Sequence, residues 1–359
     1  MIQGDKEKEL YRLMESIKDT DTKAYEECTR RWDLVAHPLH GLGVLEDDIK
    51  QIAALTGSAD VSLKRKAVVV CCADNGVVVE GISQTDSSVT GVVADNIAEG
   101  RSSVCRMAAV AGCDVIPVDL GIKDYKGHPG VKDIRIGNGT ENICEGPAMT
   151  REQAAEAVIA GIEQVRLLSE KYDIIGVGEM GIGNTTTSAA IISVLLGTDA
   201  DEVTGRGAGL SDDGLERKRK AVKKAIERSN VSKEDGLGVL EELSGFDLCG
   251  MCGLFIGGAI YRVPMIVDGI CSQAAALAAW NLTEKASDAM IGSHISSEPV
   301  SEMILNKLGI QSAISAGMHL GEGTGAVALM PMLDMALAVY SQGYTFDDGG
   351  IKAYEHFKS

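Results

Sequence analysis

The chain has 359 residues, which suits one large α/β domain with a smaller lobe, and its 45% apolar content and 42 glycines indicate a globular fold with many tight turns. A net charge of −18 and an aromatic content of 4% argue against a nucleic-acid-binding groove, which needs basic stripes and stacking rings. The N-terminus shows no signal-peptide pattern and no apolar run is long enough to span a membrane, so we expect a cytoplasmic protein.

Strand and helix patterns alternate along the chain. Residues 1–21 form a charged amphipathic helix, and the region to about residue 60 reads as helical. Five apolar segments that end in glycine or polar residues predict strands at 66–76, 114–122, 173–181, 263–269 and 288–299. Helices are predicted at 149–172, with a capping box of Thr150 and Gln153, and at 185–197, 211–229, 246–260, 271–282 and after 325.

This alternation predicts an α/β fold with a mostly parallel sheet that helices cover on both faces. We expect a small lobe from residues 1–60 together with the C-terminal end, a large α/β domain over 61–345, and a tail over 346–359. Polar and glycine residues collect where the strands end, which is the edge of an open α/β sheet that binds ligands.

Cys249 and Cys252 form a C-x-x-C pair, a spacing that redox and metal sites also use. They lie in the apolar, glycine-rich segment "FDLCGMCGLFIGGAI", which has no second pair and no nearby histidine. The interpretation we favour is close packing of this helix against another element, with the thiols as small hydrophobes. We therefore predict no metal site.

The stretch "GEMGIGNTTT", from Gly178 to Thr187, joins a predicted strand to a predicted helix. Backbone N–H groups at such a helix start favour a phosphate, and hydroxyl side chains can add donors. A tight βα turn that binds nothing remains the alternative, because the spacing matches neither G-x-G-x-x-G nor the Walker pattern.

Two further stretches share this design. "GRGAGLSDDGLERK" has three alternate glycines, Gly205, Gly207 and Gly209, before a helix that carries Lys218, although a solvated flexible loop would have the same composition. "LGEGTGA" places Glu322 between two glycines before a long apolar helix, as Glu179 is placed in the first stretch. A solvated glutamate needs no flanking glycines, so both carboxylates are expected to reach a ligand.

These stretches resemble nicotinate-nucleotide:dimethylbenzimidazole phosphoribosyltransferases, the enzymes that make α-ribazole phosphate for the lower ligand of cobalamin. The resemblance runs from "HPLHGLGVLEDDIKQIAAL" to "YTFDDGGI" and includes "ADNGVVVEGIS", "GTENICEGPAMT", "RVPMIVDGICSQAAAL" and "IGSHISSEP" in the family's order. It implies a Rossmann-like α/β domain with a small helical lobe, in a homodimer, acting on nicotinate mononucleotide and an aromatic base without a metal or other cofactor.

The resemblance also implies residue roles. Glu322 matches the general base, Glu179 the second carboxylate of the site, and Lys218 the lysine near the nucleotide phosphate. The phosphate and ribose pocket would be lined by Gly181, Gly183, Asn184, Thr185, Gly205 and Gly207, and the base pocket by Ser83, Leu320 and Asp268.

Some positions depart from the family's pattern. Asn75 replaces a histidine, His37 and His40 lie where a proline-rich segment is usual, residues 84–93 differ, and His319 occupies a position that is often basic. These changes leave the acceptor open: a benzimidazole, or a phenol or purine. A partner subunit of a heteromeric enzyme is a third possibility, which the retention of Glu179, Lys218 and Glu322 disfavours.

Overall fold

The computed structural model describes residues 4–298 and 300–356. A single sheet of seven strands lies at its centre, in the order β3-β2-β1-β4-β5-β6-β7, and every neighbouring pair is parallel. This is the Rossmann strand order with one further strand, so the predicted fold class is confirmed. The strands are β1 (Lys66–Ala73), β2 (Cys113–Gly121), β3 (Lys132–Asp133), β4 (Ile174–Met180), β5 (Met265–Val267), β6 (Met290–His294) and β7 (Ser312–Ile314).

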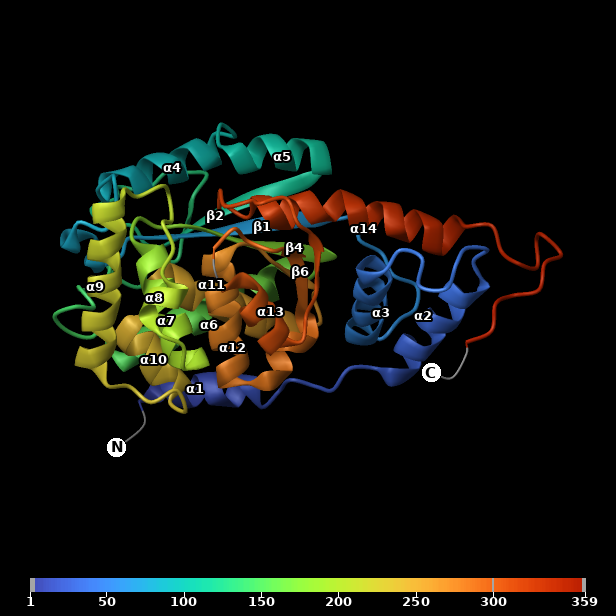
Figure 1. The fold of residues 1–359 in the computed structure, drawn as a ribbon, viewed down its shortest axis with the longest axis horizontal. Coiled ribbons are helices and arrows are strands. Elements are labelled where there is room, and N and C mark those ends of the chain that lie inside the picture. The colour runs from blue at the N-terminus through green and yellow to red at the C-terminus, as the bar shows by residue number, and fades with distance from the viewer. Residues whose placement is uncertain (1–3, 299, 357–359) are drawn as a thin grey trace.

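Helices cover both faces of the sheet (Figure 1). On one face lie α4 (Ser88–Ala98), α5 (Ser103–Ala111) and α14 (Thr324–Gln342); on the other lie α6 (Arg151–Leu168), α7 (Asn184–Leu196), α11 (Phe246–Tyr261) and α12 (Ile270–Leu282). The remaining elements are α1 (Asp5–Met14), α2 (Thr22–Leu34), α3 (Val44–Thr56), η1 (Gly76–Glu80), α8 (Ala200–Val203), α9 (Asp212–Ser229), α10 (Gly236–Leu243), η2 (Glu284–Ala289) and α13 (Ser301–Leu308).

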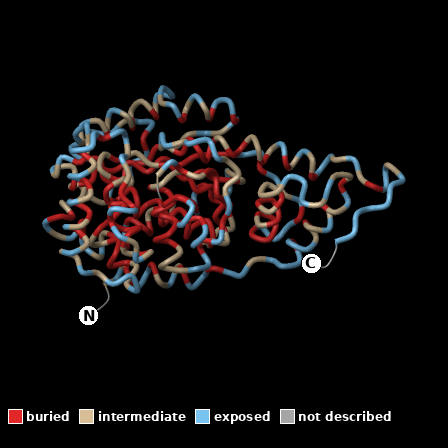
Figure 2. The backbone as a smooth tube through the Cα atoms, in the orientation of Figure 1, coloured by how far each residue is buried: buried red, intermediate tan, exposed pale blue. Residues whose placement is uncertain are grey.

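The two faces of the sheet carry separate apolar cores, because successive side chains of a strand point to opposite sides. In β1, Val69 and Cys71 pack into the core under α6 and α11, whereas Val68 and Val70 pack into the core under α5 and α14. Buried residues are concentrated around the sheet (Figure 2). Strands buried on both faces explain why the predicted segments read as continuous apolar runs.

The five predicted strands and the six predicted helices beyond residue 149 are confirmed, and so is the capping box of Thr150 and Gln153. The short edge strands β3 and β7 were not predicted, because two or three residues are too few to show a period. The predicted strands also extended too far, since β1 ends at Ala73 and β5 at Val267, one residue before Asp74 and Asp268.

The small lobe consists of α2, α3 and the C-terminal segment, which lie together at one end of the molecule (Figure 1). An isolated bridge joins Val35 to Thr345, and the Phe346 N–H donates to the Leu34 carbonyl at 3.1 Å. Helix α1 lies elsewhere: it packs against α6 of the large body, where Arg151 donates to Glu7 at 2.8 Å. The division at residues 60 and 345 stays a prediction.

Helix α14 is long and apolar enough, by those criteria alone, to cross a membrane, the only such helix found among residues 4–298 and 300–356. Half of its apolar window is buried within the fold. It packs against β4, β6 and α5, as the core helix of a folded domain does.

Candidate active site

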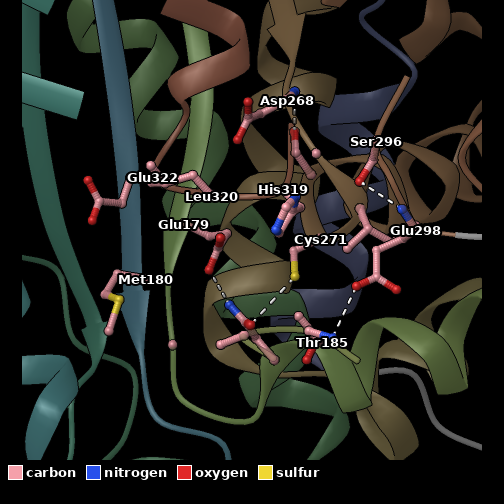
Figure 3. A pocket seen from close by; sticks show the side chains of 18 of the residues that line it. Glu179, Met180, Thr185, Asp268, Cys271, Ser296, Glu298, His319, Leu320 and Glu322 are labelled. Carbon is pink, nitrogen blue, oxygen red and sulfur yellow. Dashed lines mark hydrogen bonds between the residues drawn. The ribbon is translucent and has the colours of Figure 1, made fainter. Parts of the chain in front are cut away.

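A cavity of about 230 Å³ lies at the carboxyl ends of β4, β5 and β6 (Figure 3). Each strand supplies polar groups where its ladder stops: Glu179 from β4, Asp268 after β5, and His294 from β6. The turns before α7 and α14 complete the wall. The lining residues are Glu179, Met180, Gly181, Ile182, Asn184, Thr185, Gly207, Ala208, Asp268, Gly269, Ile270, Cys271, Ser272, His294, Ser296, Glu298, His319, Leu320, Gly321 and Glu322.

The glycine-flanked end of β4 around Glu179 is in contact with the glycine-rich turn around Glu322 before α14. A Cβ on Gly178 would lie 2.7 Å from the Glu322 carbonyl oxygen and 2.6 Å from the Gly323 nitrogen, so only glycine lets the two backbones approach this closely. Gly321, Glu322 and Gly323 have φ values of 87°, 58° and 82°. A left-handed conformation is uncommon for glutamate and costs on the order of 1–3 kcal/mol, a strain typical of functional sites.

Asp268 caps the N-terminus of α14. Its Oδ1 accepts hydrogen bonds from the N–H groups of Gly325 at 2.7 Å and Ala326 at 3.2 Å, and its Oδ2 accepts one from Gly323 at 3.1 Å. Burial raises the pKa of Asp268, while nearby His294 and the backbone N–H groups oppose that rise. Asp268 also lines the cavity, but these contacts give it a second task, which is to hold the strained turn that carries Glu322.

The Glu322 side chain extends away from Glu179 and toward α5 (Figure 3). Its Oε2 accepts a hydrogen bond of 3.1 Å from the N–H of Val104, the second residue of α5. This hydrogen bond fixes the direction of the Glu322 carboxyl. The side chain of Glu179, at the end of β4, and that of Glu322, in the turn before α14, therefore point in different directions.

Glu179 is held by Asn184, whose Nδ2 donates to Glu179 Oε2. Burial raises the pKa of Glu179 to about 8, and the charges of Asp247, Asp268 and Glu322 add to the rise, whereas the Asn184 hydrogen bond opposes it. At neutral pH the carboxyl of Glu179 is therefore mostly protonated.

Lys218 connects the glycine loop before α9 with the stretch "GEMGIGNTTT" at the start of α7. It lies on α9 with only 1% of its surface exposed, and its Nζ donates to Thr185 Oγ1 at 2.8 Å and to the Gly205 carbonyl at 3.1 Å. Burial lowers the pKa of Lys218, while the charge of Glu298 raises it. The loop before α9 and the start of α7 are thereby held together around one cation.

The carboxylate of Glu298 lies against the same loop. Its Oε1 accepts a hydrogen bond of 3.1 Å from the Gly207 N–H, and a Cβ on Gly205 would overlap its Oε2. Glu298 lines both this cavity and a second, adjoining one of about 650 Å³, whose wall also includes Arg206 and Arg219. The carboxylate of Glu298 thus lies beside the Gly207 N–H, in the wall of a cavity that also contains arginine side chains.

The predicted site residues fall into three groups. Most line the first cavity, namely Glu179, Gly181, Asn184, Thr185, Gly207, Asp268, Leu320 and Glu322. Gly205 lines the second cavity, and Lys218 lies behind Thr185. Gly183 and Ser83 line neither cavity: Gly183 is the N-cap of α7 at φ 97°, and Ser83 accepts a hydrogen bond from the Thr85 N–H beside Gln84, which bonds the Gly209 carbonyl.

Asn75 does not line either cavity. It is fully buried (0% exposed) beneath the turn before α7, where its Oδ1 accepts a hydrogen bond of 3.2 Å from Thr187. The replacement of the family's histidine by Asn75 therefore does not change a residue that lines either cavity. The effect of Asn75 reaches the site through the residues packed around it.

Sequence reasoning missed Asp247, His294 and Glu298 as members of the site. His294 and Glu298 lie in the predicted strand segment 288–299, and their position after its apolar core was an available signal. Asp247 is the only charged residue within α11, and a lone carboxylate in an apolar helix was the corresponding signal there.

The interpretation of Cys249 and Cys252 as packing residues is confirmed. Both side chains are fully buried, and a Cβ on Gly253 of the same helix would overlap the Val158 carbonyl of α6. Burial raises the pKa of the Cys249 thiol to about 12. Within the described residues, no group of three or more His, Cys, Asp or Glu side chains is arranged to hold a metal ion.

Comparison with known proteins identifies the family of the chain. A family described as phosphoribosyltransferase matches residues 17–351. The nicotinate-nucleotide–dimethylbenzimidazole phosphoribosyltransferase of Acetivibrio thermocellus is 41% identical over 347 residues, which cover 96% of this chain and 99% of the relative. The enzyme of the same name from Clostridium acetobutylicum is 39% identical with the same coverage.

Solved structures agree with the sequence comparison. The crystal structure of nicotinate-nucleotide-dimethylbenzimidazole phosphoribosyltransferase from Thermus thermophilus superposes with a TM-score of 0.86 at 35% identity. The match covers 93% of this chain and 100% of that one. The similarity therefore extends over both the sheet and the small lobe.

Proposed function

The chain belongs to the phosphoribosyltransferase family of these relatives, and we propose that it transfers the phosphoribosyl group of nicotinate mononucleotide to dimethylbenzimidazole. The products are α-ribazole phosphate and nicotinate, and the reaction serves the assembly of the cobalamin nucleotide loop. One observation carries the proposal: the glycine-flanked segments that hold Glu179 and Glu322 pack backbone to backbone at the carboxyl edge of the sheet, next to the group formed by Lys218 and Thr185.

In this reaction the bond between the pyridinium nitrogen and C1′ of the ribose breaks, and its electron pair leaves with nicotinate. A benzimidazole nitrogen forms the new bond to C1′ from the opposite face, which changes a β into an α linkage. The attacking ring becomes cationic unless its other nitrogen gives up a proton. A carboxylate within hydrogen-bond reach of that N–H accelerates such a step by typically about 10²–10⁴-fold.

Glu322 is the residue to which we assign this base. The hydrogen bond from the Val104 N–H holds its carboxyl in one direction at the wall of the cavity. Asp268 supports the assignment indirectly, because its three hydrogen bonds hold the turn on which Glu322 stands. A fixed base loses no time or free energy in reorganisation when the ring arrives.

We assign the phosphoribosyl end of the nucleotide to the loop of Gly205 and Gly207 and the start of α7. Lys218 would act there as a point charge, with backbone N–H groups as additional donors. Glu179, mostly protonated at neutral pH, would face the ribose. The residues that meet the two substrates thus come from different elements of one sheet edge.

The test is to incubate the purified chain alone with nicotinate mononucleotide and a panel of benzimidazoles, phenols and purines, and to identify products by mass. We expect α-ribazole phosphate and nicotinate from dimethylbenzimidazole. Turnover only with a phenol or a purine would replace the acceptor and keep the reaction type. Absence of any product unless a homologous subunit is added would support the heteromeric alternative.

We further propose that the protein is a cytoplasmic homodimer. The cytoplasm keeps thiols reduced, which suits the nine free cysteines of the chain. Exposed apolar side chains on α4, α5 and α14, namely Val92, Val110 and Met335, support an interface on that side of the sheet. Light scattering coupled to gel filtration is expected to give twice the mass of the chain.

A further inference from the structure

Helix α11 carries one charged residue, Asp247, which the reaction described above does not use. Its side chain is completely buried (0% exposed) in the first turn of an otherwise apolar helix. Removing a carboxylate from water costs on the order of several kcal/mol unless hydrogen bonds or opposite charges compensate the loss of hydration. The burial of Asp247 therefore needs an explanation.

Asp247 is connected to Glu179 by a single side chain. The Nδ2 of Asn184 donates one hydrogen to Glu179 Oε2 and the other to Asp247 Oδ2, the latter at 3.0 Å. The Oδ1 of Asn184 accepts a hydrogen bond of 3.5 Å from the Cys271 thiol. In this orientation the amide N–H groups of Asn184 meet both carboxyls and its oxygen meets the thiol.

Two glycines leave the space that Asp247 occupies. A Cβ on Gly181 would lie 2.5 Å from Asp247 Oδ2, and one on Gly245 would overlap Asp247 Oδ1. Asp247 Oδ1 is buried without a hydrogen-bond partner among the described residues. Buried polar atoms of this kind are rare in folded proteins.

We propose that Asp247 is a positioning residue for Glu179. Through Asn184 it orients the Glu179 carboxyl toward the cavity, and its negative charge adds to the burial that keeps a proton on that carboxyl. Glu179 then meets the ribose as a hydrogen-bond donor while Glu322 acts as the base. The role of Glu179 toward the ribose rests on the proposed function. The link from Asp247 through Asn184 to Glu179 does not depend on the substrate.

The electrostatics of the site agree with this geometry. Burial raises the pKa of Asp247 to about 6, with the Asn184 hydrogen bond and backbone N–H groups opposing the rise, whereas the pKa of Glu179 is raised to about 8. Between these values the two carboxyls together retain one proton. The other ionisable groups that face the pair are Asp268 after β5, Glu322 before α14, Cys271 on α12, and Cys71 and Cys72 on β1.

The experiment is the pH dependence of kcat/KM for wild type and Asp247→Asn, which removes the charge and keeps the size. If Glu179 works in its protonated form, activity falls as pH rises through its pKa, and this alkaline limb is expected to move to lower pH in the variant. A limb that stays where it is in wild type overturns the proposal. Cys252→Ala, another buried change on α11, is the matched control and is expected to leave the limb in place.

A second variant separates orientation from charge. Asn184→Ser cuts the link and retains the charge of Asp247, so we expect a lower kcat. The alkaline limb is expected to move to higher pH, opposite to its shift in Asp247→Asn, because the Asn184 hydrogen bond lowers the pKa of Glu179. Full kcat in Asn184→Ser would overturn the orienting role. Thermal unfolding establishes that each variant folds.

An infrared titration without substrate keeps the proposal testable if no Asp247 variant folds. The band of a protonated carboxyl, assigned to Glu179 by its loss in Glu179→Gln, is expected in wild type at neutral pH. An ionised Glu179 there overturns the proposal. Since this readout needs no turnover, a wild type that titrates as expected but makes no product would instead count against the proposed function.

Discussion

The N–H of Val104 donates a 3.1 Å hydrogen bond to Glu322 Oε2, across 218 positions of the chain. This contact ties the first turn of α5, on one face of the sheet, to the strained turn before α14. It fixes the direction of a carboxylate that local sequence leaves free to rotate. The contact therefore decides where the proposed base stands.

Glu322→Gln is expected to lower kcat by about 10²–10⁴-fold while the nucleotide still binds. Glutamine can accept the same hydrogen bond from Val104, but it cannot take a proton from the incoming ring. Steady-state kinetics and nucleotide binding by calorimetry check this. Retention of more than about a tenth of the wild-type rate would show that another group is the base.

Lys218→Ala is expected to raise the KM for nicotinate mononucleotide much more than the KM for the base. The ammonium is held by Thr185 and the Gly205 carbonyl at the predicted phosphate end of the site. Lys220→Ala, an exposed lysine on the same helix, is the matched control and is expected to change neither value. Equal increases for both substrates in Lys218→Ala would mean that the lysine only supports the fold.

Glu298→Gln is expected to lower the KM for the nucleotide. The Glu298 carboxylate accepts the Gly207 N–H and lies against Gly205, so it competes with a phosphate for the same donors and for the charge of Lys218. An amide competes less well because it is uncharged. Inorganic phosphate should also inhibit the variant at lower concentrations, and a raised nucleotide KM would instead mean that Glu298 binds the substrate.

Glu179 is expected to make stability fall as pH rises. Its pKa is raised from 4.5 to about 8 in the folded protein, mainly by burial, so the folded state holds a proton that the unfolded state has already released. That contribution is complete below the unfolded value and is lost as pH rises through the folded value. Urea unfolding across this window is expected to show a flatter pH dependence for Glu179→Gln; parallel curves would contradict the assignment.

The double variant Cys249→Ala with Cys252→Ala is expected to keep its activity and metal content. Both thiols only fill space between α11 and its neighbours, so the loss should be a packing defect of about 1–3 kcal/mol in the free energy of unfolding. Chemical unfolding and metal analysis check this. Stoichiometric zinc in wild type that disappears in the variant would reopen the interpretation as a metal site.

The sequence by itself determined the five longer-patterned strands, most of the helices and the edge of the sheet that forms the site, but not the short edge strands β3 and β7. Runs such as "KAVVVCC" and "DIIGVG" can be buried only in a sheet covered on both faces, and glycines beside Glu179 and Glu322 mark turns where backbones approach closely. These signals are local in the chain. Periodicity and turn chemistry reach only a few residues, and within that range they predicted the fold correctly.

Only the tertiary structure decided how the polar groups of the site are partnered. Asp268 was expected in the base pocket, yet it also caps α14, 55 to 58 positions away, and Asp247 reaches Glu179 through Asn184, 63 positions from its own place in the chain. A hydrogen bond depends on distances of a few ångströms between atoms, and the chain brings such atoms together only when the sheet forms. Which residue types form the site can therefore be predicted from short stretches of sequence. Which way their side chains point, and whether their carboxyls are protonated, depends on the folded structure.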